Sequence, residues 1–423
     1  MIVKGFSTLA LEPWPFPIHE LPAHTYLVGG SVRDALMGRR RDYLDLDFVL
    51  AEGAVETAST IAGLHHAGFT VLDAERQIAR VVFDHATADF ALQEGETLAI
   101  DLFRRDFTIN AIAYDPHNGQ LIDPVHGCAD LQRGIVRMIA RNNLRDDPLR
   151  LLRAYRQAAQ LEFTLEPSTQ EAIRELAPHL TTVAAERVQA ELFYLLRSPL
   201  GTPWLHQAWQ DGLFRDWLPS ARANSFDQIT QIDQWVLTLQ DPLPQFIGEL
   251  HRPLRATQKP HIDGRTFLNT VKLTPLVSPM PAIAALELSH LKISRHQLQT
   301  VLTLLHLAPL LHSQAQLNVR DHYFLFQKAG NTLPALIILA LATGCTLPAI
   351  QPLIDQYLDP HNPVAHPTPP LTGQDLIQTL NLSPGPLMGQ LLTEIQIAKA
   401  EGHISIREDA LDWAKKWLEQ NAF

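Results

Sequence analysis

Cysteine is scarce in this sequence, and basic residues do not dominate it. Of 423 residues only Cys128 and Cys345 are cysteines, and they fit neither a disulfide framework nor a Cys-x-x-Cys metal site. Both thiols suit a reducing compartment. Lysine and arginine total 34 against 45 aspartates and glutamates, a formal net charge of −11. Proteins that coat nucleic acid without selectivity bind through many cationic contacts to phosphate, so this balance argues against that class.

Long apolar runs are also lacking. Residues 1–17 carry one lysine and an apolar stretch broken by Glu12 and three prolines, so we expect no secretory signal there. The most apolar segment, 333–350, is bracketed by Pro334 and Pro348, which leave too few residues for a helix across a bilayer. We therefore expect a buried helix, no membrane association and a cytoplasmic location.

The remaining composition is that of an ordinary globular protein, with 46% hydrophobic and 19% charged residues. Between residues 24 and 140 short β-rich runs alternate with helical segments. From Pro148 onward the apolar spacing is helical, and Ser294 with Gln297 forms a capping-box pattern before one helix. The fold class predicted is an α/β head, a mixed β-sheet with helices, followed by all-α domains. The expected strands are 26–29, 47–50, 80–83, 88–92 and 109–114.

The first chemical motif is a strand that enters a glycine turn, Gly29-Gly30, and then a helix carrying Arg33. Glycine lets backbone N–H groups approach phosphate oxygens closely, and a helix N-terminus favours an anion. Gly30 and Arg33 are therefore candidate nucleotide-binding residues. On its own, such a turn also fits a purely structural role.

The second motif is a pair of carboxylates, Asp45 and Asp47. On an extended strand these residues point to the same face, where they can share divalent cations. Mg²⁺ held there can deprotonate an attacking 3′-hydroxyl and neutralise the charge that grows as pyrophosphate leaves. We predict that Asp45 and Asp47 are both the catalytic and the metal-binding residues, although a bare Asp-x-Asp is common on protein surfaces.

Two further motifs are rich in arginine. Arg105 and Asp106 lie in Arg104-Arg105-Asp106, where an Arg-Asp pair can hold a ribose hydroxyl and a phosphate or form a structural salt bridge. The stretch 133–156 carries seven arginines and no lysine, and planar guanidinium groups suit phosphates and base edges.

Asp147 precedes Pro148, which fits the first position of a helix, so Asp147 also fits the N-cap. Asp147 could accept from an exocyclic amino group while Arg150 donates to the neighbouring ring nitrogen and carbonyl, the pattern offered by cytosine. Arg150, Arg153 and Arg156 sweep one arc of about 120° on that helix. Protein side chains would then replace a nucleic-acid template.

In this order the motifs resemble the class II tRNA nucleotidyltransferases, which are the CCA-adding enzymes and their bacterial poly(A) polymerase relatives. The likeness spans nearly the whole chain except 220–290. It implies that Arg105 and Asp106 bind the sugar, that Asp147 and Arg150 bind the base, and that Arg153 and Arg156 approach the triphosphate. The implied partners are the tRNA 3′ end and the substrate CTP, with ATP as a further candidate substrate. The implied cofactor is Mg²⁺. The domains implied are a nucleotidyltransferase head (1–139), a base-reading neck (140–205), a tRNA-binding helical body (206–358), a Pro-rich linker (359–370) and a tRNA-binding helical tail (371–423).

The sequence departs from the family at two places. His126 occupies a position where the family usually has glycine. Only residues 93–103 separate the strand 88–92 from Arg104, whereas complete CCA-adding members usually carry a longer flexible loop there. Its lack resembles enzymes that add two cytidines and leave adenosine to a separate A-adding enzyme, so CC-adding is favoured over full CCA-adding.

Two alternative functions stay open at this stage. One is a bacterial poly(A) polymerase, although residues 404–423 carry three basic residues against four acidic ones and so offer no basic tail for long RNA. The other is a catalytically inactive tRNA-binding protein, which would require a broken metal pair, whereas Asp45 and Asp47 are both present.

Overall fold

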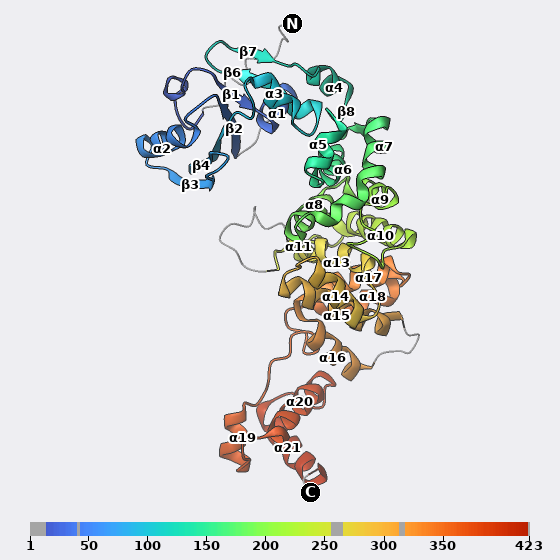
Figure 1. The fold of residues 1–423 in the computed structure, drawn as a ribbon. Coiled ribbons are helices and arrows are strands. Elements are labelled where there is room, and N and C mark those ends of the chain that lie inside the picture. Colours follow the sequence, from blue (N-terminus) through green and yellow to red (C-terminus); the bar gives the residue numbers. More distant parts are fainter. Residues whose placement is uncertain (1–13, 40–42, 255–264, 313–317, 422–423) are drawn as a thin grey trace. The chain divides into compact units, whose positions relative to one another are not determined.

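The computed structural model describes residues 14–39, 43–254, 265–312 and 318–421 (Figure 1). The chain forms two compact units, Met1–Asp216 and Trp217–Phe423. The first unit contains the sheet and the helices that follow it, and the described residues of the second unit form helices and no strand. This arrangement confirms the predicted fold class of an α/β head followed by all-α parts.

The head is built on a seven-stranded sheet in the order β3-β4-β5-β2-β1-β6-β7. Its pairs are antiparallel except β2 with β5, which run parallel. The strands are β1 (Thr25–Val28), β2 (Leu44–Leu50), β3 (Gly68–Asp73), β4 (Ile78–Val82), β5 (Ala86–Leu92), β6 (Ala113–Asp115) and β7 (Gln120–Ile122).

Four of the five expected strands are confirmed, and the fifth differs. Residues 109–114 begin with the 3-10 helix η2 (Thr108–Asn110), and only the end of the run joins β6. The head sheet also contains two strands that the sequence pattern did not indicate. β3 is an edge strand with almost every residue exposed, so it lacks the alternation of a half-buried strand. β7 has only three residues.

Aromatic rings fill the core of the head. Phe48 and Phe90 are opposite one another in the β2–β5 pairing and stack at 5.1 Å. Phe16 lies against both rings, and α2 (Ala54–Leu64) packs on β4 and β5 with Ile61 buried. The other head helices are η1 (Ile18–Glu20), α1 (Gly30–Leu36), α3 (Leu98–Phe103) and α4 (Gly127–Arg133).

The turn before α4 explains the first departure from the family. His126 has φ +59°, in the left-handed region that favours glycine. At the next position a Cβ on Gly127 would lie 2.1 Å from the Thr108 carbonyl oxygen, so only glycine fits. Asp123 accepts the backbone N–H groups of Gly127 and Cys128 at 2.7 and 2.9 Å. The turn is therefore preserved, with histidine in a strained backbone position.

The neck completes the first unit. Its elements are α5 (Arg141–Asp146), α6 (Leu149–Leu161), α7 (Pro167–Leu176), η3 (Ala177–Thr182), α8 (Ala185–Arg197), α9 (Gly201–Gln210) and the short parallel pair β8 (Ile135–Val136) with β9 (Thr164–Leu165). α6 packs against α8 and α9. Buried Asp211 accepts hydrogen bonds from Tyr155 of α6 and from Gln170 and Arg174 of α7. This carboxylate joins three parts of the neck.

The second unit contains a body and a tail. The body comprises α10 (Ala223–Gln240), α11 (Pro244–His251), α13 (Phe267–Leu273), η4 (Thr274–Leu276), α14 (Pro281–His290), α15 (Arg295–His312), α16 (Val319–Ala329), η5 (Gly330–Thr332), α17 (Leu333–Ala342) and α18 (Leu347–Leu358). The tail has α19 (Gly373–Leu380), α20 (Pro386–Ala400) and α21 (Arg407–Asn421), with their own apolar core. The Gln297 N–H donates to Ser294 Oγ at 3.4 Å, which confirms the expected helix start.

The apolar segment 333–350 forms two helices instead of the single one expected. All ten residues of α17 are buried, and α18 begins at Leu347 after a break at Gly344, where φ is +114°. By length and apolarity the run Val319–Ala342 could cross a membrane, but 67% of its most apolar window is buried in the body. It therefore serves as a core element of the fold.

Candidate active site

The two predicted metal ligands lie on β2 at the centre of the head sheet. Asp45 and Asp47 are two residues apart, so they share one face of the strand. The Thr87 hydroxyl donates to Asp45 Oδ1 at 2.7 Å. Asp47 is paired in register with Asp89 of β5, whose carboxylate is held by Arg80 of β4 through two bonds of 2.6 and 2.7 Å.

This row of carboxylates carries unbalanced negative charge. Burial and the neighbouring charges of Asp45 and Asp89 together raise the pKa of Asp47 to about 7, although Arg105 and Arg80 oppose the rise. A group in this state favours a nearby cation. No set of three or more His, Cys, Asp or Glu side chains in the described ranges is arranged to hold a metal ion. Because magnesium is often held by one or two carboxylates with substrate phosphates as further ligands, the Asp45–Asp47 pair fits that metal.

Arg80 and Asp89 are site residues that the sequence reasoning missed. They directly face one another across the antiparallel β4–β5 pair. The strand 88–92 was expected, but its polar face was not considered. Alternation along β5 places Thr87 and Asp89 on one side, and the parallel pairing then sets them beside Asp45 and Asp47. That alternation was the available signal.

The glycine turn lies directly against the carboxylates. Gly29 has φ +76°, and a Cβ there would be 3.3 Å from Asp47 Oδ2 and 3.6 Å from Arg105 Nη1. Gly30 opens α1. Arg105 is itself held by an ion pair to Asp101 at 3.1 Å. The structure therefore brings the first three motifs together at one point of the sheet.

Arg33 and Asp106 belong to a buried polar network. Arg33 Nη1 donates to Asn110 Oδ1 at 2.7 Å, and its Nε and Nη2 donate to Asp34 Oδ1. Asn110 Nδ2 in turn donates to Asp106 Oδ1 at 2.9 Å. Asp106 Oδ2 accepts from Arg153 Nε at 2.9 Å. This chain of contacts links the glycine turn, the Arg-Arg-Asp motif and α6.

The carboxylate of Asp106 is held ionised. Burial alone would raise its pKa, but Arg153, Asn110 and the Phe107 N–H outweigh burial and hold the pKa below its ordinary value. The pKa of Arg153 is raised chiefly by Asp106. Both groups therefore keep their charges at neutral pH, and Asp106 fixes the position of the Arg153 guanidinium.

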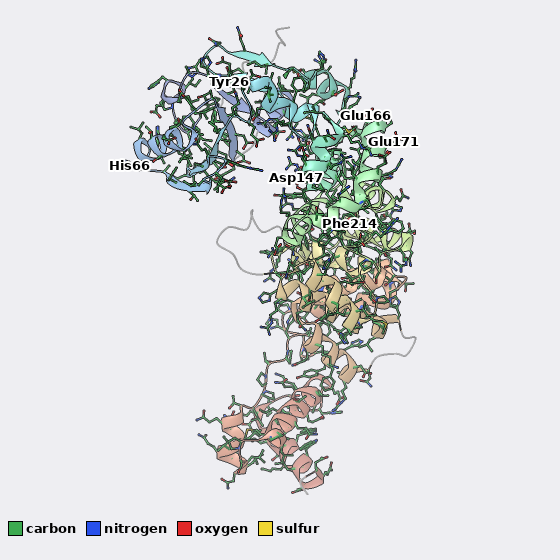
Figure 2. All side chains as sticks on the ribbon, in the orientation of Figure 1. Tyr26, His66, Asp147, Glu166, Glu171 and Phe214 are labelled. Carbon is green, nitrogen blue, oxygen red and sulfur yellow. The ribbon has the colours of Figure 1, made fainter. Side chains whose placement is uncertain are left out.

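Asp147 follows α5, is separated from α6 by Pro148 alone, and is labelled in Figure 2. Its Oδ1 accepts the Leu149 N–H at 3.3 Å, as an N-cap does, and Pro148 has helical dihedral angles. Its Oδ2 accepts from Arg187 of α8 at 3.0 Å. The carboxylate is about one-third exposed, at 31%. It is therefore oriented from two sides and still open to solvent.

The three arginines of α6 do not share one set of partners. Arg150 Nη1 donates to the Arg104 and Asn143 carbonyl oxygens at 2.9 and 3.0 Å, and Arg153 binds Asp106. Arg156 instead pairs with Glu191 of α8 at 2.6 Å and lies over the Tyr194 ring. Both hydrogen bonds of Arg150 use Nη1, so Nε and Nη2 remain as donors for a base edge.

One face of α6 is fastened to the head along its whole length. Arg150 and Arg153 make the first two contacts, as above. One and two turns further on, Gln157 Oε1 accepts from Asn110 at 3.0 Å, and the Gln160 carbonyl oxygen accepts from Arg39 at 3.1 Å. Gln157 is 2% exposed. These contacts fix the position of the helix that carries the base-reading candidates.

The short segment 93–103 is closed by its own hydrogen bonds. The Glu94 N–H donates to Asp101 at 3.1 Å, and Thr97 caps α3 by accepting from the Ile100 N–H. Gly95 has φ +91°, and a Cβ there would be 2.5 Å from a methyl group of Ile100. The segment is a tight turn followed at once by α3, with no long loop.

Sequence comparisons identify the protein family of this chain. The CC-adding tRNA nucleotidyltransferase of Synechocystis sp. is 50% identical over 406 residues, which cover 95% of each chain. The chain belongs to the tRNA nucleotidyltransferase family. This finding confirms the resemblance drawn from the motifs.

Other members of this family differ in their named activities. The CC-adding enzyme of Geobacter sulfurreducens is 31% identical and the A-adding enzyme of Deinococcus radiodurans 30% identical, each over 96% of this chain and 96% and 98% of their own. Three family models match the chain: “Poly A polymerase head domain” at 25–137, “Probable RNA and SrmB- binding site of polymerase A” at 162–224 and “tRNA nucleotidyltransferase domain 2 putative” at 270–414.

Solved structures support the fold. A CCA-adding enzyme in an apo form aligns with a TM-score of 0.72 at 19% identity, over 94% of this chain and 91% of that one. This tRNA nucleotidyltransferase therefore shares its fold with the CCA-adding enzymes.

Proposed function

We propose that this tRNA nucleotidyltransferase adds two CMP residues to the 3′ end of tRNA without a nucleic-acid template and then stops. The proposal is supported by the 50% identical relative that carries the CC-adding name. The observation that carries it in this chain is the tied-down segment 93–103, together with a reading helix fastened to the head.

The reaction is a displacement at the α-phosphorus of CTP. The 3′ oxygen of the tRNA forms a bond to that phosphorus, the bond to the bridging oxygen breaks, and pyrophosphate leaves with the electron pair. Magnesium held by Asp45 and Asp47 would lower the pKa of the 3′-hydroxyl and neutralise charge on the leaving group. The Gly29-Gly30 turn and Arg105 border these carboxylates, and we assign them contacts to the triphosphate.

Base selection is assigned to Asp147 and Arg150. The Asp147 carboxylate accepts from the amino group of cytosine, and Arg150 donates to the ring nitrogen and carbonyl. Uracil and guanine place a carbonyl where the amino group should be, so they leave Asp147 facing an acceptor. We assign Arg153 contacts to the sugar and phosphates of CTP, and Asp106 contributes by holding Arg153 in position. Arg156, paired with Glu191, stays the more remote candidate for the triphosphate.

Failure to add the final adenosine follows from the fixed geometry around Asp147 and Arg150. Adenine also offers an amino group beside a ring nitrogen, so discrimination depends on space for the larger ring. Admitting a purine requires α6 to move away from the head, which would break the contacts made by Gln157 and Gln160. The closed turn 93–97 offers no flexible segment that could drive such a movement.

An enzyme that stops at CC requires a second enzyme in the same compartment. A separate A-adding enzyme would complete the CCA end, and an A-adding tRNA nucleotidyltransferase is known among the relatives, in Deinococcus radiodurans. We place the protein in the cytoplasm, in keeping with two free thiols. We propose domains at 1–139, 140–205, 206–358, 359–370 and 371–423, with the limit at 205 shifted to the end of the first unit at Asp216, because α9 (Gly201–Gln210) crosses 205.

The test is a product-length assay with a tRNA transcript that ends at its unpaired 3′ base. The enzyme should add two residues with CTP alone and also with CTP and ATP together, and none with ATP alone. Mg²⁺ should be required, and a chelator should stop the reaction. Extension by three residues with both nucleotides would refute CC-adding in favour of CCA-adding. Long adenosine tails would indicate poly(A) polymerase instead.

A further inference from the structure

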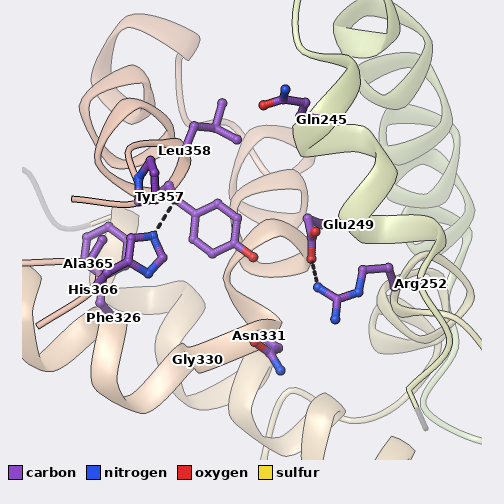
Figure 3. Close-up of a pocket in the computed structure, with 11 residues that line it drawn as sticks. Gln245, Glu249, Arg252, Phe326, Gly330, Asn331, Tyr357, Leu358, Ala365 and His366 are labelled. Carbon is purple, nitrogen blue, oxygen red and sulfur yellow. Dashed lines mark hydrogen bonds and ion pairs between the residues drawn. The ribbon is translucent and has the colours of Figure 1, made fainter. Parts of the chain in front are cut away.

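A cavity of about 600 Å³ lies in the body, which belongs to the second unit of the chain (Figure 3). Its walls come from α11, from the junction of α16 with η5, from the end of α18 and from the residues that follow α18. Its volume falls within the usual range for small-ligand sites, about 300–1,000 Å³. α11 belongs to the stretch 220–290, for which the family resemblance offers no role.

An aromatic side chain forms one wall of this cavity. Tyr357 is half-buried and packs edge-on against Phe246 at 6.3 Å, and its ring lies 6.0 Å from that of His366. His366 Nε2 also bonds to the Tyr357 carbonyl oxygen at 2.8 Å, as Figure 3 shows. These contacts hold a flat apolar surface at the cavity in a fixed position, which suits stacking of a planar ring.

The polar groups around that surface include an ion pair, a phenol hydroxyl and two amides, and their formal charges cancel. Glu249 and Arg252 form an ion pair on one side of the Tyr357 ring. Burial, together with Glu249, raises the pKa of Tyr357 to about 12, so its hydroxyl stays neutral. Two amides, Gln245 and Asn331, are exposed at the rim. Because the guanidinium is neutralised, neither a phosphate cluster nor a free cation suits the cavity.

A nucleobase matches this combination. Every base has a π-face that stacks on an aromatic side chain, and stacking is worth about 1–3 kcal/mol per base. Guanine offers adjacent N–H donors on N1 and N2 beside the O6 acceptor. A carboxylate next to a guanidinium presents the complementary pattern, since carboxylates accept and arginine donates to O6 or N7. The Glu249–Arg252 pair therefore favours guanine over the other three bases.

We propose that this cavity binds one unstacked guanine base, stacked on Tyr357 and read by Glu249 and Arg252. The base could come from bound tRNA or from a free guanine nucleotide, and the two sources share this chemistry. The tRNA source rests on the proposed function, because only an enzyme that holds tRNA would present such a base here. The free-nucleotide source does not.

The first experiment is equilibrium dialysis of the full chain with guanosine, with cytidine as the comparison probe. Guanosine should bind saturably and more tightly than cytidine. Tyr357→Leu should weaken guanosine binding about 5- to 150-fold through lost stacking, whereas Tyr357→Phe should retain it. Glu249→Gln should reduce the preference for guanosine without removing stacking. Leu237→Ala, at an exposed apolar residue of α10, is the control and should change nothing.

The second experiment separates the two sources. Saturating tRNA should displace guanosine, and Tyr357→Leu should raise the KM for tRNA while leaving kcat and the KM for CTP unchanged. Joint binding of tRNA and guanosine would instead indicate a free-nucleotide site. CMP addition by the wild-type enzyme, measured on the same samples, tests the proposed function independently. Absence of Tyr357-dependent guanosine binding, together with equal KM values for tRNA in the Leu and Phe variants, would overturn the proposal.

Discussion

Replacing Asp47 by asparagine should abolish nucleotide addition and at the same time stabilise the metal-free protein near neutral pH. The reason is electrostatic. Asp47 is half-buried beside Asp45 and Asp89, and these surroundings oppose its ionised form. Asparagine has nearly the same shape and carries no charge, so it removes this repulsion. The same substitution removes a proposed metal ligand.

The magnitude follows from the shifted pKa. A carboxyl group whose pKa rises from 3.8 to about 7 on folding is destabilised by about 4 kcal/mol once the pH exceeds 7. Because the pKa of this carboxyl group is higher in the folded state than in the unfolded state, the group does not destabilise the wild type below pH 4. The destabilisation grows as the pH rises and is complete above about pH 7. Solvent near the carboxylates reduces this figure, so we expect a gain of about 1–4 kcal/mol for Asp47→Asn at pH 7.5.

The assay is denaturant unfolding in EDTA at pH 5 and pH 7.5. The gain in the free energy of unfolding should be larger at pH 7.5 than at pH 5. Mg²⁺ should raise the stability of the wild type and leave Asp47→Asn nearly unchanged. Asp84→Asn, at an exposed carboxylate between β4 and β5, serves as the control. Equal stability of Asp47→Asn and wild type at pH 7.5, or an equal Mg²⁺ response, would refute this reasoning.

Other substitutions probe the neck and the head. Gln157→Ala should loosen α6, lower the free energy of unfolding by about 1–3 kcal/mol, and raise AMP incorporation; unchanged AMP incorporation would speak against the fastened helix. Asp147→Ala should weaken rejection of UTP and GTP more than it slows CMP addition, and Arg187→Ala should do so to a lesser degree; full rejection in Asp147→Ala would leave capping as its only role. Gly127→Ala should destabilise the head by more than about 3 kcal/mol, because its Cβ would lie 2.1 Å from the Thr108 carbonyl oxygen; chemical denaturation measures this loss.

Local patterns predicted the parts of the site that lie on single segments. Asp45 and Asp47 alternate on one strand, and the Pro148 signal places the start of α6 to within one residue. Gly29 was predicted from its neighbours in sequence, and its positive φ explains the requirement. Each of these features depends on residues close together in the chain.

Features that depend on pairing between distant segments could not be predicted in this way. Arg80 and Asp89 come to lie beside Asp45 and Asp47 only through the sheet register. The bond between Gln157 and Asn110 joins positions 47 residues apart. Arg153 was expected at the triphosphate, and its bond to Asp106 became visible only once α6 was placed against the head. Tertiary contacts of this kind leave no periodic signal in the sequence.

Whether synthesis stops after two cytidines is tested most directly by comparing the rates of AMP and CMP addition. Single-turnover addition of AMP to tRNA ending in CC is compared with addition of CMP to tRNA ending in a single C, for the wild type and for a variant with a longer family loop between Gln93 and Asp101. We expect wild-type AMP addition to be far slower than CMP addition, and the graft to raise AMP addition with little change for CMP. Wild-type AMP addition as fast as CMP addition would exclude CC-adding activity.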